Sequence, residues 1–331
     1  MDIRKTFLDK LMARRDEYLL INGKNIREYY IYSKTQITSH TAYGDVKIGS
    51  SLVNLPSGRK IVSSEMPITN ESGANLLNEF FKNDVHVFIT LTSANKIGKH
   101  EISNFHIGDN IYGNRVLSIS KNIPITTDMF LHSMTLYSGY SERTIEQIQY
   151  TGWQDDGFVF EPDKKYRKSN LRVSNDLIEL AKNQIITTKS AEIIDKIITN
   201  ANRLSKNGNI AINCNAGLGR TSFLSVLFVA SELRNDYRES SLEKLINDSI
   251  KYFQKQAPLF LYDDQLIHLY EVAGKLFPEL VRDPLEAKDR FISILSANPY
   301  EPEKSYSKKS INFGKYIKPQ KIIERRNSFS I

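Results

Sequence analysis

Hydrophobic positions along the chain switch between the two-residue period of strands and the longer period of helices. Residues 85–91 are mostly apolar, with His86 among apolar neighbours, which is typical of a buried strand. Residues 134–150 alternate between apolar and polar positions, which predicts a pair of strands. Residues 45–53 and 59–68 flank a Pro-Ser-Gly turn, which predicts a hairpin.

Apolar residues elsewhere recur every three or four positions, which predicts helices. The segments with this spacing are 1–22, 75–81, 176–184, 190–205, 220–233, 241–256 and the later part of 258–277. Residues 92–130 contain several turn residues and no clear period. Strands interspersed with helices predict an α/β fold.

The stretch 209–222 predicts a strand, a glycine turn and a helix in direct succession. Residues 210–212 are apolar, Gly217 and Gly219 follow, and an apolar run begins at Phe223. Such a turn directs backbone N–H groups and the positive end of a helix at one point, which suits an anion such as phosphate.

Two reactive residues flank this turn. A cysteine near a helix N-terminus generally has a lowered thiol pKa, so we expect thiolate at Cys214, the single cysteine of the chain. Arg220 follows six positions later and can offer two donors to phosphoryl oxygens. The alternative interpretation is a buried structural cysteine in an unrelated α/β protein.

The segment Cys214-Asn-Ala-Gly-Leu-Gly-Arg220-Thr221 resembles the C-x5-R-[ST] signature of protein tyrosine phosphatases of the eukaryotic type. The resemblance implies a tyrosine-phosphatase-like α/β fold, with a central twisted mixed sheet flanked by helices. It also implies that Cys214 is the nucleophile and that Thr221 donates to the departing thiolate. The phosphate would be bound by the loop residues Asn215, Ala216, Gly217, Leu218, Gly219 and Arg220.

A second patch, Trp153-Gln154-Asp155-Asp156-Gly157, is similar to the acid-bearing loop of the family, which reads Trp-Pro-Asp-x-Gly. The resemblance makes Asp155 the general acid and Trp153 the anchor of the loop. Without it, Trp153 could equally be a core residue and the two aspartates a turn.

Two further site assignments rest on the resemblance alone. Gln265 matches the second of the two family glutamines that position water, while Leu261 stands at the first. The alternative for Gln265 is an exposed residue in the first turn of a helix. The substrate-recognition loop aligns with Ile26, Arg27 and Glu28, where Ile26 replaces the usual tyrosine.

The residue before the nucleophile also departs from the family. Asn213 stands where the family has a histidine that supports the loop and the thiolate. We expect Asn213 to supply a hydrogen bond to the loop but no charge, and therefore a weaker nucleophile.

Composition indicates the cellular compartment and shows where the net charge of the chain lies. The chain has 331 residues, of which 40% are hydrophobic and 25% are charged, and it contains no 18-residue apolar run. Its single cysteine excludes an internal disulfide and fits a reducing compartment. The net charge of +7 equals the charge of residues 304–331, which hold six lysines and two arginines against Glu324. We therefore expect residues 1–22 to be a helix packed on the domain, 23–280 a catalytic domain with an insert at about 160–190, and 281–331 a basic, partly disordered extension.

These features together predict an enzyme that hydrolyses phosphate monoesters, with protein phosphotyrosine as the favoured substrate, and that needs no metal or cofactor. The alternatives are a phosphoinositide phosphatase and a catalytically weak phosphate-binding module. The basic tail and insert could contact an acidic partner or a membrane surface, and no nucleic-acid partner is expected. We expect a cytoplasmic protein, and because the N-terminus lacks a Sec signal peptide, the resemblance also allows a bacterial effector released into a host cytosol.

Overall fold

A mixed sheet runs through the centre of the computed structural model. The structure describes residues 36–41, 44–66, 70–91, 108–112, 115–119, 123–138, 140–153, 158–160, 185–206, 208–214, 217, 219–257, 259, 261 and 263–281. All of them belong to one compact unit, Met1–Asn298. The predicted N-terminal helix, most of the insert and the basic extension lie outside the described residues, so the predicted domain boundaries stay predictions.

In the described part of the chain, ten strands form the sheet. In chain order they are β1 (Gln36–Thr41), β2 (Gly44–Asn54), β3 (Lys60–Glu65), β4 (Val85–Leu91), β5 (Gly108–Tyr112), β6 (Arg115–Ile119), β7 (Ile123–Thr126), β8 (Met129–Ser138), β9 (Ser141–Tyr150) and β10 (Asn209–Cys214). Their order across the sheet is β1-β2-β3-β10-β4-β9-β8-β6-β5, and β7 pairs with β8. The four central strands β3, β10, β4 and β9 are parallel, and the pairs on either side are antiparallel.

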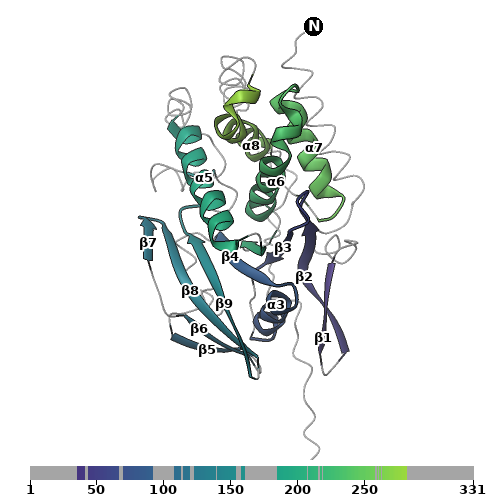
Figure 1. Cartoon of the computed structure of the whole chain (residues 1–331), viewed down its shortest axis with the longest axis vertical. Helices are drawn as coiled ribbons and strands as arrows, with labels where there is room; N and C mark the ends of the chain where they lie inside the picture. Colours follow the sequence, from purple (N-terminus) through teal and green to yellow (C-terminus); the bar gives the residue numbers. More distant parts are fainter. Residues whose placement is uncertain are drawn as a thin grey trace, which may run out of the picture. The chain divides into compact units, whose positions relative to one another are not determined.

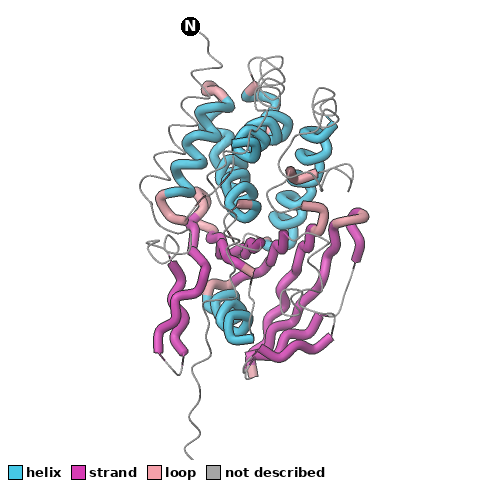
Figure 2. The backbone as a smooth tube through the Cα atoms, turned by 180° about the vertical axis from the view of Figure 1, so that it is seen from behind, coloured by secondary structure: helices cyan, strands magenta, loops and turns pink. Residues whose placement is uncertain are grey.

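Helices cover both faces of this sheet (Figures 1 and 2). One face carries α5 (Ile185–Ser205), α6 (Arg220–Leu233), α7 (Leu242–Gln254) and α8 (Asp263–Leu276), and the other carries α3 (Asn70–Lys82). Two short 3-10 helices, η4 (Arg234–Tyr237) and η5 (Pro278–Leu280), follow α6 and α8. The expected α/β fold with a mixed sheet between helices is therefore confirmed. No helix in the described part of the chain is long and apolar enough to cross a membrane.

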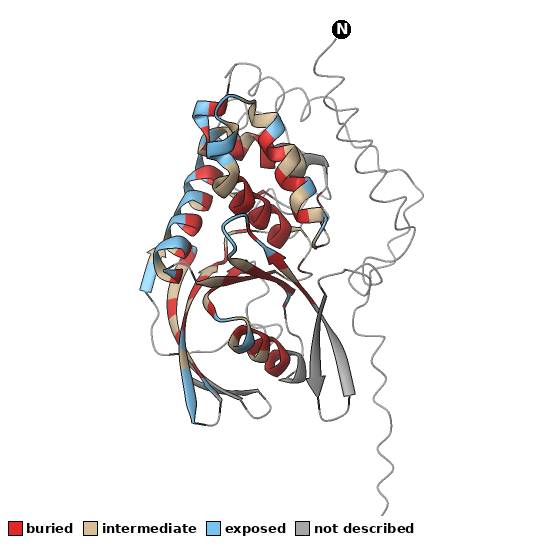
Figure 3. Ribbon diagram, turned by 45° about the vertical axis from the view of Figure 1, so that its right-hand side comes forward, coloured by how far each residue is buried: buried red, intermediate tan, exposed pale blue. Residues whose placement is uncertain are grey.

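The two faces of the sheet form two separate hydrophobic clusters, because successive strand residues point to opposite sides. In β10, Ile210, Ile212 and Cys214 join the cluster under α5 to α8, while Ala211 joins the cluster around α3. Helix α6 is buried from Arg220 to Ala230, which Figure 3 shows as a red helix inside the layer. The helix that begins at the glycine turn is thus the central element of its layer.

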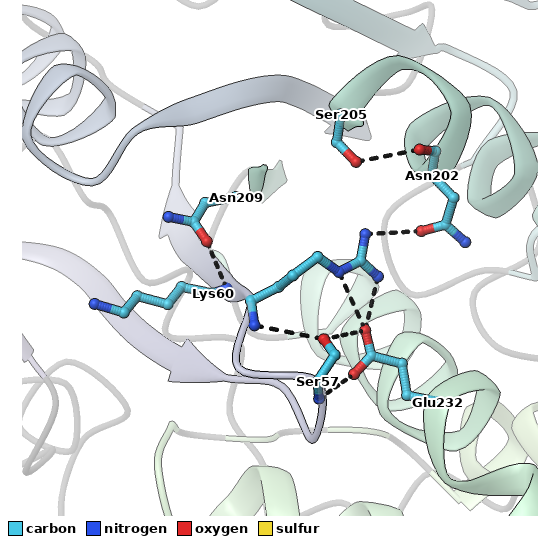
Figure 4. Close-up of polar contacts among 7 residues, drawn as sticks. Ser57, Lys60, Asn202, Ser205, Asn209 and Glu232 are labelled. Atoms are coloured by element: carbon cyan, nitrogen blue, oxygen red, sulfur yellow. Dashed lines mark hydrogen bonds and ion pairs between the residues drawn. The ribbon is translucent and has the colours of Figure 1, made fainter. Parts of the chain in front are cut away.

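A polar network fixes the hairpin turn against the helices (Figure 4). Gly58 has φ +88°, which explains a glycine in the turn between β2 and β3. The adjacent Arg59 donates to Glu232 Oε1 at 2.7 Å and to Asn202 Oδ1 at 3.0 Å. Ser57 donates its N–H to Glu232 Oε2 at 2.9 Å. The network ties the turn to α5 and to the last turn of α6.

Several element boundaries differ from the predicted ones. Helix α3 begins at Asn70 instead of 75, and α5 begins at Ile185 instead of 190. Helix α7 begins after Ser241, whose side chain accepts the Lys244 N–H at 3.2 Å and so caps the helix. Strands β5, β6 and β7 lie in the region 92–130, for which the sequence predicted no element.

Candidate active site

The turn between β10 and α6 carries the two reactive residues. Cys214 is the last residue of β10 and is 3% exposed. Gly217 has φ +69°, a conformation that a residue with a side chain adopts only with strain, and Gly219 is the N-cap of α6. Arg220 is the first residue of α6, so both residues flank one glycine turn at the positive end of a buried helix.

This turn lies at the carboxyl edge of the parallel strands, which is where open α/β sheets bind their ligands. Cys214 pairs in register with Glu65, the last residue of β3. Strand β9 lies two positions from β10 in the sheet and ends at Tyr150, and Trp153 follows three residues later. The topology therefore brings the glycine turn to the same edge as Trp153. This residue begins the segment that contains the predicted general acid (residues 153–157, the acid-bearing segment).

Arg220 joins these two segments directly. Its Nη1 donates to the backbone carbonyl oxygen of Trp153 at 2.8 Å, across 67 residues of sequence. The side chain is buried, with Arg220 only 3% exposed. A guanidinium held beside the glycine turn can offer parallel N–H donors to an oxyanion.

Trp153 is packed firmly in the core. It is 1% exposed, and its ring meets the ring of Phe223 edge-on, with 5.1 Å between centroids and an interplanar angle of 88°. Phe223 lies one turn into α6. Trp153 is thus both a core residue and the start of the acid-bearing segment, which fits its predicted part as anchor.

Thr221 and Gln265 are both buried. Thr221 has no exposed surface, and its Oγ1 has no hydrogen-bond partner in the part of the chain that the structure describes. Gln265, the third residue of α8, is 4% exposed, so the interpretation as an exposed glutamine is wrong. The predicted catalytic roles of both residues stay predictions.

The remaining predicted site residues lie outside the described residues. They are the general acid Asp155, the loop residues Asn215, Ala216 and Leu218, and the recognition residues Ile26, Arg27 and Glu28. Among the residues that are described, no three His, Cys, Asp or Glu side chains gather into a possible metal site.

Asn213 requires a correction. The sequence predicted a hydrogen bond from its side chain to the nucleophile loop, but neither Oδ1 nor Nδ2 has a partner within the described ranges, and the residue is 1% exposed. The physical reason is strand alternation, since neighbours along a strand point to opposite faces and Cys214 faces α5 to α8. Asn213 therefore points to the α3 face, beside the register partners Ser64 and Thr90.

Three residues that contact this region carry no functional signal of their own in the local sequence pattern. Phe223 packs on Trp153, Ser190 accepts the Phe160 N–H at 3.2 Å, and His268 lies 3.1 Å from Ser190 Oγ through its Nε2. The available signal was the position of His268 three residues after Gln265, which puts both on one helix face. Nothing in the local sequence marked Ser190.

A glycine turn at a helix N-terminus, flanked by a thiol and an arginine, defines a site suited to binding a phosphate ester. The model of the protein-tyrosine phosphatase family matches residues 24–273, and the chain belongs to this family. It is accordingly a protein-tyrosine phosphatase, a hydrolase.

Solved structures show the same fold. The catalytic domain of human protein tyrosine phosphatase non-receptor type 18 (PTPN18) superposes with a TM-score of 0.58 at 14% identity, covering 84% of this chain and 97% of that one. A complex of PTPN18 with HER2 phosphopeptides gives 0.60 at 14% identity, with 83% and 100% covered. The Trypanosoma cruzi phosphatase TcPTP1 gives 0.55 at 16% identity, with 75% and 76% covered. No curated protein sequence matches the chain.

Proposed function

We propose that the protein hydrolyses phosphotyrosine in phosphorylated proteins through a cysteinyl phosphate on Cys214. The observation that carries the proposal is the hydrogen bond from Arg220 to the Trp153 carbonyl, because it joins the glycine turn to the acid-bearing segment. A module that only binds phosphate needs no such connection, since it needs no general acid.

In the first step, the Cys214 thiolate attacks phosphorus, and a sulfur–phosphorus bond forms as the bond to the tyrosine oxygen breaks. Arg220 and the backbone N–H groups of the turn stabilise the charge on the equatorial oxygens. Asp155 gives its proton to the leaving phenolic oxygen, which departs as neutral tyrosine. The charge stabilisation comes from residues of this chain, so no metal is required.

In the second step, water attacks the cysteinyl phosphate. Gln265 orients the water, and the Asp155 carboxylate takes its proton. The sulfur–phosphorus bond breaks and releases phosphate, while Thr221 donates its hydroxyl proton in a hydrogen bond to the departing Cys214 thiolate. The buried Thr221 Oγ1, with no partner among the described residues, supports this role.

Chain geometry supports Asp155 as the acid. Asp155 follows Trp153 by two residues, and two residues span at most about 7 Å between Cα atoms. Arg220 binds the Trp153 carbonyl, and this contact supports Asp155, the first acid after Trp153 in the sequence, as the proton donor.

Phosphotyrosine is favoured over phosphoinositides for two reasons. The solved PTPN18 complex contains HER2 phosphopeptides, and this chain shares its fold. The three non-glycine residues between Cys214 and Arg220 are uncharged, and a lipid headgroup with extra phosphates would favour lysines there. The single cysteine fits work in a reducing compartment, and we propose the cytosol as its place of action.

The test compares phosphate release from phosphotyrosine peptides and from phosphoinositides by the wild type, Cys214→Ser and Asp155→Ala. We expect turnover of the peptides by the wild type, none by Cys214→Ser, and retained peptide binding by Cys214→Ser. Faster release from phosphoinositides would assign the lipid substrate instead. Peptide binding without any turnover by the wild type would make the protein a binding module, and ordinary turnover by Cys214→Ser would exclude the cysteinyl phosphate.

A further inference from the structure

The segment that follows the proposed acid is held by three different elements. Phe158, Val159 and Phe160 come directly after residues 154–157. The Tyr150 hydroxyl of β9 donates to the Val159 carbonyl oxygen at 2.7 Å. Ser190 Oγ of α5 accepts the Phe160 N–H at 3.2 Å, and the Phe158 ring lies 4.8 Å from the His268 ring of α8. Residues 158–160 are therefore tied to the sheet and to two helices.

Ser190 and His268 form one hydrogen-bonded unit. His268 Nε2 lies 3.1 Å from Ser190 Oγ, and the two residues are 1% and 0% exposed. Burial lowers the pKa of His268 to about 3, so the ring is neutral at physiological pH. In the tautomer that carries its hydrogen on Nδ1, the neutral ring accepts a hydrogen bond from the Ser190 hydroxyl at Nε2, while Ser190 Oγ accepts from the Phe160 N–H. The chain of donors then runs in one direction, from the Phe160 N–H through Ser190 to His268.

The imidazole also belongs to an aromatic row that reaches the other end of the acid-bearing segment. The rings of His268 and Phe223 lie 5.9 Å apart, and Phe223 in turn meets Trp153 at 5.1 Å. Trp153 precedes residues 154–157 and Phe158 follows them. The row Trp153–Phe223–His268–Phe158 therefore supports both ends of a four-residue segment.

Simple core packing does not account for a histidine here. A phenylalanine would fill a place between Phe158 and Phe223 without the cost of burying a polar ring. Unlike a phenyl ring, the imidazole provides a hydrogen-bond partner at Nε2 for Ser190, which itself holds the Phe160 backbone.

We propose that His268 and Ser190 are positioning residues that fix the segment after the proposed general acid and so hold Asp155 at the leaving oxygen. The inference rests on the proposed function, because it takes Asp155 as the acid. Gln265 lies three residues before His268 on the same face of α8. One face of α8 therefore carries both His268, which positions the acid, and Gln265, which orients the water.

The test uses two aryl phosphates that differ in leaving group. Protonation of the leaving oxygen speeds the hydrolysis of phenyl phosphate, because phenolate is a poor leaving group. The same protonation has little effect on the hydrolysis of dinitrophenyl phosphate. His268→Phe keeps a ring but removes the nitrogen acceptor, and Ser190→Ala removes the hydroxyl. We expect each variant to lose about tenfold in kcat on phenyl phosphate, since small misplacements cost up to about 10²-fold, and to keep its kcat on dinitrophenyl phosphate.

A matched control is His132→Phe. His132 is also a buried histidine, 7% exposed, but it lies in β8, where its Nε2 is 3.2 Å from Gln149 Oε1. We expect His132→Phe to have the same ratio of kcat on phenyl phosphate to kcat on dinitrophenyl phosphate as the wild type. Because Ser190→Ala deletes a single atom, it provides the test if His268→Phe does not fold.

Combining each variant with Asp155→Ala separates this inference from the proposed function. If the pair acts through Asp155, His268→Phe and Ser190→Ala cause no further loss in the Asp155→Ala background. Equal losses on both substrates, or a further loss in that background, would overturn the inference alone. If Asp155→Ala itself shows no preference between leaving groups, the proposed acid is wrong.

Discussion

Arg220 Nη1 donates to the Trp153 carbonyl oxygen at 2.8 Å, and this contact joins the two segments that the proposed chemistry needs. Neither segment can move far without affecting the other. An oxyanion that binds the other N–H donors of the same guanidinium lies close to the Trp153 carbonyl, so its binding changes the environment of Trp153.

The first prediction uses the fact that Trp153 is the single tryptophan of the chain. Orthovanadate, a phosphate mimic, should change the tryptophan fluorescence with a saturable dependence on its concentration. Arg220→Lys should weaken vanadate binding about tenfold or more, because an ammonium cannot replace two parallel donors. Arg59→Lys is the control, since Arg59 binds Glu232 at the hairpin turn. Equal vanadate affinity in Arg220→Lys would contradict the assigned role of Arg220.

The second prediction distinguishes the two neighbouring aspartates. Asp155→Ala should lower kcat on phenyl phosphate by about 10²-fold or more, because it removes the proton donor to a poor leaving group. Asp156→Ala should keep most of the activity, which makes it the matched control. Steady-state kinetics of both variants measure this, and an equal loss in Asp156→Ala would reverse the assignment.

The third prediction concerns the buried amide of Asn213. Because neither amide atom has a partner in the described part of the chain, Asn213→Leu should keep the free energy of unfolding or raise it by about 1 kcal/mol. Gln147→Leu is the control on the same face of the sheet, since Gln147 Nε2 donates to Thr90 Oγ1 at 2.9 Å. Losing this hydrogen bond in Gln147→Leu should lower the free energy of unfolding by about 1–3 kcal/mol.

Urea unfolding at pH 7 measures both variants. If Asn213→Leu loses as much stability as Gln147→Leu, Asn213 has a hydrogen-bonding role in the folded protein after all.

The fourth prediction is the pH dependence caused by His268. Burial lowers its pKa from 6.5 to about 3, so the unfolded chain binds a proton before the folded one does. The stability contributed by neutral His268 is present above about pH 6.5 and is lost progressively as the pH falls toward 3. Between pH 7 and pH 5 this single group should lower the free energy of unfolding by about 2 kcal/mol.

His268→Phe removes this contribution and should therefore lose about 2 kcal/mol less than the wild type over the same interval. Urea unfolding at the two pH values provides the comparison, and His132→Phe controls for the loss of a buried imidazole elsewhere. The same pH dependence in wild type and His268→Phe would show that the buried ring does not govern acid stability.

The sequence predicted those parts of the fold that depend on neighbouring residues. The hairpin at Gly58, the buried strand β4 and the strand–turn–helix around Cys214 were confirmed, because strand alternation and glycine turns are local properties. The start of α3 was placed too late, since Ser72 and Gly73 favour turns over helix interiors. Strands β5 to β7 were missed because their region contains many turn residues.

The chemistry of the site divides in the same way. By itself, the sequence determined the family and predicted the nucleophile and its arginine, because a reactive cysteine, two glycines and an arginine must stand at short, specific distances along the chain. Only the tertiary structure decided that Arg220 binds Trp153, that Ser190 meets His268 across 78 residues, and that the Asn213 amide faces α3 without a partner among the described residues. Those contacts depend on how the parallel strands and the helices over them pack together, and packing joins residues whose separation in the sequence carries no signal of their contact.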